Sequence, residues 1–304
     1  MGPVSSPDLA VAVADAGGVG TVSALGVPSE AFVRGLDDMR RRTSGVLSAN
    51  VLLADTGEDA IVLAAERVQL VDFFWFDPSP RLVELVHRAG ALVGWQVGSV
   101  AEARAAAAAG CDVVIAQGSE AGGHVRGDRP LLPLLHEVLD AVPVPVLAAG
   151  GIADARTFAA VMAAGADGVR IGTRFIASSE SAAHQAYKQA IVDAAGDCTV
   201  IGDTFARDCP LCATRPRHRV LRSAADRAAT IGGDIVATLT VNGRQLPIPR
   251  GAGLPPTTAV EGDVAAMALY AGAGAGAVTN IRPAVEVISD LMTSPGSHDT
   301  TAAH

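Results

Sequence analysis

Apolar and polar residues alternate in blocks along the first 190 residues of the chain. Short, continuous apolar runs recur at regular intervals, and the longer stretches between them have the apolar spacing of amphipathic helices. Continuous apolar runs are typical of strands in a parallel sheet that is covered on both faces. The predicted strands are residues 19–25, 46–53, 69–76, 91–97, 112–117, 144–149 and 168–172.

Turn residues separate the predicted strands from the predicted helices. Ala89-Gly90 and Ala109-Gly110 each end a helical stretch directly before a strand, where glycine takes up the left-handed conformation easily. Ser79-Pro80 marks a helix start, with a cap followed by proline in the first turn. This alternation predicts a TIM-type (β/α)8 barrel or a doubly wound sheet, and the absence of a GxGxxG motif after the first strand favours the barrel.

The alternation divides the chain into parts. Residues 1–190 are predicted to form the barrel, and residues 191–262 an insertion or lid that holds a CxxC motif and a short β-like stretch. Residues 263–292 return to helices of the barrel. Residues 293–304 form a polar tail that we expect to be disordered.

Composition and charge narrow the classes of function. The chain has 304 residues, of which 49% are hydrophobic, so a large core can form. A net charge of −9 without a long Lys/Arg run argues against a nucleic-acid partner. The run Arg40-Arg41-Arg42 ends a predicted helix, where it complements the helix dipole. No signal peptide is visible and glycines interrupt the uncharged stretch 264–281, so we expect no membrane helix and a cytoplasmic location.

The cysteines suggest a metal only weakly. Cys209 and Cys212 form a CxxC motif, and with Cys198 before it and His218 after it four zinc ligands can be counted. Their spacing matches no strong zinc pattern. We therefore expect free thiols in a loop and no metal, with structural zinc or redox chemistry as the alternative.

Candidate chemistry lies where the predicted strands end, because functional residues of barrels gather at the carboxyl ends of the strands. Residues 116–124 read AQGSEAGGH and bring glycines, a carboxylate and a histidine to the end of one strand. Two later strands, 144–149 and 168–172, run through glycines into helices. Such turns bind phosphate through backbone N–H groups and the helix dipole, although glycines also serve to make tight turns.

The segments AQGSEAGGH, VPVLAAGGIAD and RIGTRF, in this order and spacing, resemble the nitronate monooxygenase family, formerly called 2-nitropropane dioxygenase. Enoyl-acyl-carrier-protein reductase II is a relative of that family. The segments SPDLAVAVADAGGVG and SANVLL, and the late segment HRVLRSA…MALYAGAGAGAVTNIRPAVEVI, extend the resemblance over almost the whole chain. The resemblance implies an FMN-dependent barrel that oxidises alkyl nitronates, and by extension nitroalkanes, with O2 to a carbonyl compound and nitrite. It leaves the oligomeric state open.

The resemblance also implies a set of site residues. His124 matches the family's catalytic histidine, and an imidazole can remove a C–H proton or, when protonated, hold the nitronate anion. The alternative for His124 is a loop histidine that caps a carbonyl group. Glu120 either orients His124 or forms a salt bridge outside the site. The residues expected to bind FMN are Asn50, Gln117, Gly122, Gly151, Arg170, Ile171, Gly172 and Thr173. Those from Gly151 onward would hold its phosphate, largely through their backbone.

The chain departs from the family in three places. Gln96 stands where some members have a lysine, and Ala273 replaces a glutamine near the flavin. The family's first strand would end before Met1, so we expect seven strands with a gap between the first and the last. A natural start roughly ten residues upstream would supply one strand, and FMN would otherwise bind weakly or need a partner that covers the gap.

Two other functions remain open from the sequence. The first is an NAD(P)H-dependent FMN enzyme that reduces enoyl thioesters. The second is a barrel that binds FMN or another phosphate ligand without turnover, because one strand is absent.

Overall fold

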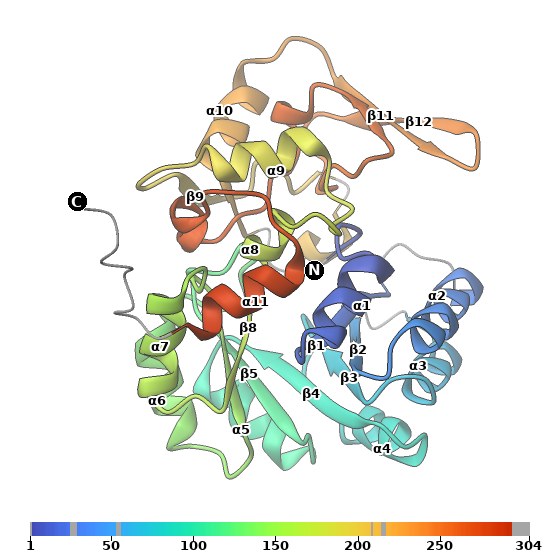
Figure 1. Cartoon of the computed structure of the whole chain (residues 1–304), viewed down its shortest axis with the longest axis vertical. Coiled ribbons are helices and arrows are strands. Elements are labelled where there is room, and N and C mark those ends of the chain that lie inside the picture. The colour runs from blue at the N-terminus through green and yellow to red at the C-terminus, as the bar shows by residue number, and fades with distance from the viewer. Residues whose placement is uncertain (1, 25–28, 53–55, 208, 214–216, 294–304) are drawn as a thin grey trace, which may run out of the picture.

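The computed structural model describes residues 2–24, 29–52, 56–207, 209–213 and 217–293. A parallel sheet with helices around it forms one part, and a second group of helices and two antiparallel sheets forms the other (Figure 1). In spatial order the parallel strands are β1 (Val19–Ser23), β2 (Val46–Val51), β3 (Leu70–Phe73), β4 (Leu92–Val97), β5 (Val113–Gln117), β7 (Val146–Ala149) and β8 (Gly168–Arg170).

The strand order settles the choice between the two predicted architectures. The seven strands pair in parallel and in chain order, and β1 and β8 are the two edges of the sheet. A doubly wound sheet would instead reverse its strand order at a switch point. The barrel prediction is therefore confirmed, including seven strands with an opening between the first and the last in the described part of the chain.

Helices follow most strands and cover the outer face of the sheet (Figure 1). Val71, Val93 and Val114 of the central strands are completely buried, because helices cover the sheet on the side away from the curl. The helices of this part are α1 (Pro7–Asp15), α2 (Ser29–Arg42), α3 (Glu58–Ala65), α4 (Pro80–Arg88), α5 (Val100–Ala108), α6 (Leu131–Leu139), α7 (Ala155–Ala163), α8 (Thr173–Ile176) and α11 (Ala284–Met292).

The helix boundaries follow the turn residues of the sequence. Ser79 accepts a hydrogen bond from the backbone N–H of Leu82, and Pro80 begins α4. Gly90 and Gly110 have φ of 95° and 93°, the left-handed conformation that ends a helix at low cost. Local sequence thus fixes where α4 and α5 begin and end.

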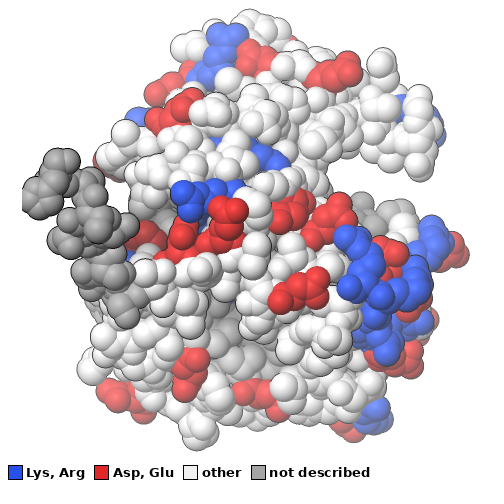
Figure 2. Space-filling model, viewed as in Figure 1, with Lys and Arg blue, Asp and Glu red and all other residues white. Residues whose placement is uncertain are grey.

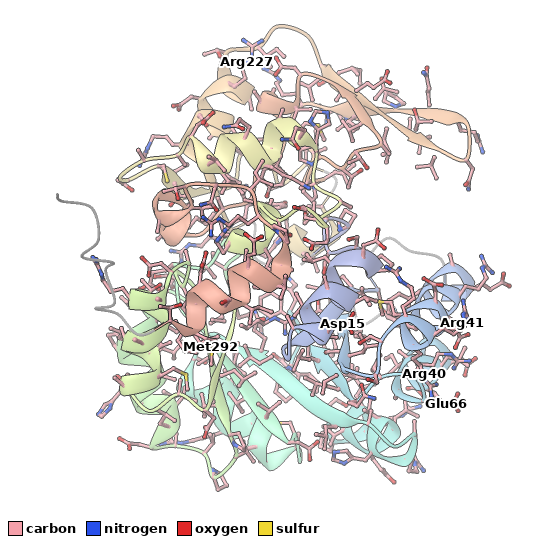
Figure 3. All side chains as sticks on the ribbon, viewed as in Figure 1. Asp15, Arg40, Arg41, Glu66, Arg227 and Met292 are labelled. Carbon is pink, nitrogen blue, oxygen red and sulfur yellow. The ribbon has the colours of Figure 1, made fainter. Side chains whose placement is uncertain are left out.

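Charged side chains gather at the end of α2, where blue and red residues are interleaved in Figure 2. Arg42 pairs with both Asp8 and Asp38, at 2.7 and 3.2 Å. Arg40 donates to the backbone oxygen of Glu66 at 3.4 Å, which ties α2 to the end of α3 (Figure 3). The basic run ends the helix as predicted, and Arg42 has acidic partners there.

The second part of the molecule consists of segments that follow α8, together with the short strand β6 from the loop after β5. Its antiparallel sheets have the orders β6-β10-β9 and β12-β11-β13. Its elements are β6 (Gly123–His124), α9 (Gln185–Val192), β9 (Thr199–Gly202), β10 (His218–Leu221), α10 (Arg222–Thr230), β11 (Ile235–Val241), β12 (Arg244–Pro249) and β13 (Val260–Gly262), with 3-10 helices at Pro210–Ala213, Val264–Ala266 and Ala273–Ala277.

The segment before α1 connects the two parts. Ser5 donates through its hydroxyl to the backbone oxygen of Thr21 in β1, and Val4 accepts from the backbone N–H of Ala182.

The predicted boundaries at 190/191 and 262/263 stay predictions. The predicted tail, apart from its first residue Thr293, lies outside the described residues. Among the helices that the structure describes, none combines the length and the apolar character that crossing a membrane requires.

Candidate functional site

A buried carboxylate forms the centre of one polar cluster at the carboxyl ends of the parallel strands. Asp72 of β3 is completely buried, and one of its oxygens, Oδ1, accepts hydrogen bonds from Asn50 and from Arg170, both at 2.5 Å. Its other oxygen accepts from the hydroxyl of Ser48 at 3.2 Å. We call Ser48, Asn50, Asp72 and Arg170 the Asp72 cluster. It joins β2, β3 and β8, so the charge of Arg170 is neutralised inside the curl of the sheet.

The Asp72 cluster leaves one acceptor unused. Asn50 Oδ1 is buried and has no hydrogen-bond partner in the described part of the chain. Buried polar atoms in native proteins are nearly always paired, so such an atom indicates a donor that belongs to a ligand or a water. The Arg170 side chain, in contrast, is committed to Asp72 and not to a phosphate. Its predicted phosphate contact through backbone stays a prediction.

The predicted cofactor-binding glycines differ in what surrounds them. A Cβ on Gly122 would stand 2.5 Å from the backbone nitrogen of Gly272, so this glycine is required by a close approach of two backbone segments. Gly151 has φ of 73°, and its Cβ position faces Glu120 at 3.1 Å. Around the Cβ position of Gly172, the described residues other than its chain neighbours leave a space of 4 Å. Of these three, Gly172 alone faces open space.

The turn after β8 is tied to the 3-10 helix that contains Ala273. Thr173 Oγ1 accepts from the backbone N–H of Gly272 at 2.9 Å, and the backbone N–H of Ala273 donates to the backbone oxygen of Glu120 at 2.8 Å. Ile171 packs against the core of the barrel. The segment with Ala273 is therefore held through its backbone.

Gln117, at the end of β5, fixes the backbone of the histidine motif. Its Nε2 donates to the backbone oxygen of His124 at 3.0 Å, and its Oε1 accepts from the backbone N–H of Arg126 at 2.9 Å. The amide is 3% exposed. Its predicted contact with a flavin ring stays a prediction, but both ends of the amide already position His124.

A second cluster forms around His124. His124 Nε2 lies 3.2 Å from Cys209 Sγ and 3.3 Å from Cys212 Sγ. We call these three residues the His124–cysteine cluster. Cys198 and His218, the other two ligands counted in the sequence, are not part of this group. Cys209 and Cys212 form no disulfide, and both contact the candidate catalytic histidine.

Aromatic rings enclose the His124–cysteine cluster. The ring centres of Trp75, Tyr270 and His218 lie 5.3, 5.8 and 6.0 Å from that of His124. His218 stands opposite His124 in the β6–β10 pair, and strand residues directly opposite each other share a face of the sheet. The position of His218 thus follows from strand pairing and not from its sequence neighbours.

Burial disfavours the charged forms of His124, His218 and Cys212. It lowers the pKa of His124 to about 3, with His218 as the next cause, and it lowers the pKa of His218 to about 4. It also raises the pKa of the Cys212 thiol to about 12, to which the neighbouring Cys209 contributes. Both imidazoles are therefore neutral at pH 7. Removal from water disfavours the charged form of an imidazole, which argues for the base role of His124 over anion binding by its protonated form, and the catalytic role of His124 stays a prediction.

Glu120 has neither of the roles that the sequence suggested. Both of its carboxylate oxygens accept from the backbone N–H of Leu131, at 2.9 and 3.0 Å. Leu131 is the first residue of α6, and a carboxylate at a helix start is stabilised by the free N–H groups and the dipole there. Glu120 therefore caps α6 and does not orient His124.

Sequence reasoning missed two features. Asp72 was visible as a carboxylate within the apolar run 69–76, which is a signal for a buried, paired charge. The contact of His124 with the CxxC motif had no such signal, because β6 contains only two residues and pairs with a strand more than ninety positions later.

The curled parallel sheet and the polar clusters at its carboxyl edge define the class of TIM-type β/α barrels. The sequence profile of nitronate monooxygenase matches residues 46–294. The chain belongs to the nitronate monooxygenase family of oxidoreductases.

Individual relatives agree with this assignment. One relative is (3aS,4S,5R,7aS)-5-hydroxy-7a-methyl-1-oxo-octahydro-1H-indene-4-carboxyl-CoA dehydrogenase of Mycobacterium tuberculosis. The two sequences are 35% identical over a match that covers 73% of this chain and 61% of the relative. Nitroalkane oxidase of Streptomyces ansochromogenes has a similar structure, with a TM-score of 0.75 and 28% identity over 96% of this chain and 92% of that one. FabK of Thermotoga maritima gives a TM-score of 0.76 and 28% identity, over 96% and 89% of the two chains.

Proposed function

We propose that this chain is an FMN-dependent oxidoreductase that oxidises alkyl nitronates with O2 to a carbonyl compound and nitrite. The observation that carries the proposal is the unpaired, buried Asn50 Oδ1 at the carboxyl edge of the sheet. A flavin ring carries an N–H group that can donate to such an acceptor. The family assignment and the likeness to a nitroalkane oxidase support the same conclusion.

The residues at this edge fit FMN. Asn50 Oδ1 would accept from the ring, and the backbone N–H groups at Gly172 and Thr173 would hold the phosphate, because the Cβ position of Gly172 faces open space. The neutralised Asp72–Arg170 pair adds no net charge beside the ring. FMN, when bound, would supply the electron acceptor and the reaction with O2.

His124 is the proposed catalytic residue. Its imidazole would take the proton from the carbon next to the nitro group at Nε2, the nitrogen that faces the two sulfur atoms. Gln117 and the β6–β10 pair hold its backbone, so the ring position is fixed before a substrate arrives. A nitronate has already lost this proton. A comparison of activity on neutral nitroalkanes with activity on their nitronates therefore measures proton removal separately from the later steps of the reaction.

A second candidate is the NAD(P)H-dependent reduction of an enoyl thioester. The 35% identity to a carboxyl-CoA dehydrogenase favours it. Both candidates need FMN, but they differ in the source of the electrons.

The experiment uses the FMN-loaded protein with two sets of substrates. We expect O2 uptake with release of nitrite on addition of the nitronate of a short nitroalkane. Consumption of NADH or NADPH that requires crotonyl-CoA, without nitrite release from the nitronate, would replace the lead proposal by the second candidate. If the protein is yellow but converts neither set of substrates, the conclusion would be that the barrel binds FMN without catalysing either reaction.

A further inference from the structure

Three ligand atoms of the metal-binding type converge at the His124–cysteine cluster. The imidazole nitrogen and the two sulfur atoms all lie within 4.8 Å of one another, and each sulfur is 3.2 or 3.3 Å from the nitrogen. A tetrahedral Zn²⁺ with ordinary bond lengths would place a nitrogen and a sulfur ligand about 3.6 Å apart. The two distances need to grow by only a few tenths of an ångström.

The fold holds the three ligands from both sides. On one side, Gln117 and the pairing of β6 with β10 fix the backbone of His124. On the other side, the two cysteines lie in or next to one 3-10 turn, in which the Cys212 N–H donates to the Cys209 oxygen at 3.0 Å. Trp75 Nε1 donates to the Leu211 oxygen at 2.6 Å and ties the turn to the barrel. The ligand positions are thus set by contacts outside the cluster.

The chemistry of the ligands selects the cation. Thiolate and imidazole ligands suit Zn²⁺, whereas Mg²⁺ and Ca²⁺ require oxygen ligands. Two thiolates and a neutral imidazole around Zn²⁺ carry no net charge, which suits a site enclosed by Trp75 and Tyr270. Three protein ligands leave the fourth tetrahedral position for water or substrate, as in zinc sites that are not purely structural.

We infer that His124, Cys209 and Cys212 form a binding site for one Zn²⁺ per chain. The site does not rest on the proposed function, because its ligands and their geometry are independent of any substrate. It replaces the expectation of no metal, which considered Cys198 and His218 as the remaining ligands and not His124.

The site has one consequence that does rest on the proposed function. Zn²⁺ occupies His124 Nε2, the nitrogen assigned to proton removal. The metal-bound protein would then act on preformed nitronates but not on neutral nitroalkanes, and a chelator would restore the second activity.

The test measures metal binding directly on the full-length protein, reduced and kept under nitrogen. Elemental analysis after equilibration with Zn²⁺ gives the stoichiometry, and competition with a coloured chelator gives the affinity. The Co²⁺-loaded protein should show the sulfur-to-cobalt charge-transfer band and the intense visible bands of a tetrahedral thiolate site. We expect one Zn²⁺ per chain.

Variants separate this site from binding elsewhere. Cys209→Ser and Cys212→Ser should each lower the Zn²⁺ affinity by about 100-fold or more. Removal of a residue that only forms a hydrogen bond to a ligand would lower the affinity by about 10–100-fold. Cys198→Ser, a half-buried cysteine outside the cluster, should bind like the wild type. The absence of binding, or binding that Cys198→Ser weakens as much as Cys209→Ser does, would overturn the inference. These readouts do not use activity, so failure of the proposed function would leave them unchanged.

Discussion

The Asp72 cluster and the His124–cysteine cluster are both polar and enclosed, but they are assembled differently. The Asp72 cluster takes its side chains from strands of one sheet, and its charged carboxylate has Arg170 as a partner. The His124–cysteine cluster joins segments 85 positions apart, and burial disfavours the charged forms of its His124 and Cys212. The first cluster therefore couples the strands of the sheet. The second brings an imidazole nitrogen and two sulfur atoms together, which can bind a ligand or react.

The comparison predicts opposite results when each cluster is altered. Removal of Asp72 or Arg170, the charged pair of the Asp72 cluster, should mainly lower stability, since a buried charge loses its partner. Removal of a group from the His124–cysteine cluster should mainly change activity or ligand binding.

The largest expected effect is on the activity of His124→Ala. In metal-free, FMN-loaded protein, turnover of neutral nitroalkanes should fall by about 10²–10⁴-fold, the usual loss when a general base is removed. Turnover of preformed nitronates should fall much less. His136→Ala, an exposed histidine of α6, is the matched control. An equal loss on both substrates would show that His124 contributes to binding and not to proton removal.

Asp72→Ala should give the largest loss of stability. It leaves Arg170 partly buried without its partner and takes the acceptor from Asn50, which should lower the free energy of unfolding by about 3–5 kcal/mol. Urea unfolding measures this change. Asp77→Ala removes an exposed partner of Arg126 and should change it by about 0–1 kcal/mol. Similar losses for the two variants would refute the role given to the Asp72 cluster.

Two glycine variants compare closed and open positions. Gly122→Ala forces a shift of the backbone at Gly272 and should lower the free energy of unfolding by about 1–3 kcal/mol. Gly172→Ala adds a methyl group in open space and should change it by less than about 0.5 kcal/mol. Thermal or urea unfolding of both variants provides the measurement. The account fails here if Gly172→Ala is the less stable of the two.

The smallest effect concerns the bond between Trp75 and the CxxC turn. Trp75→Phe removes the hydrogen bond to the Leu211 oxygen and should lower the free energy of unfolding by about 0.5–1.5 kcal/mol more than ring size alone explains. Trp95→Phe loses a longer hydrogen bond, at 3.3 Å, and serves as the control for ring size. If Trp95→Phe loses more stability than Trp75→Phe, the turn is not held by this bond.

The barrel could be predicted from the sequence because its signals are local. Ser79-Pro80 and Gly90 fix helix ends within a few residues, and the continuous apolar runs mark strands. Gln117 and His124 were recognisable because they belong to one short motif at the end of a strand.

The contacts between distant segments could not be predicted in this way. The cofactor contact of Gly122 stays a prediction, but nothing in the sequence indicated that a Cβ at Gly122 would meet the backbone of Gly272, which lies 150 positions later. The same holds for Cys209 and His124. Their contact depends on the pairing of β6 and β10 and on the Trp75 bond, which exist only after the chain has folded.

A titration of the FMN-free protein with FMN shows whether the carboxyl edge of the parallel sheet holds this cofactor. Flavin fluorescence and the visible absorbance follow the binding. We expect saturation at one FMN per chain and an affinity about tenfold lower in Gly172→Ala, equivalent to about 1.4 kcal/mol, with unchanged stability of that variant. The absence of saturable binding, or equal affinity of Gly172→Ala and the wild type, would contradict this expectation.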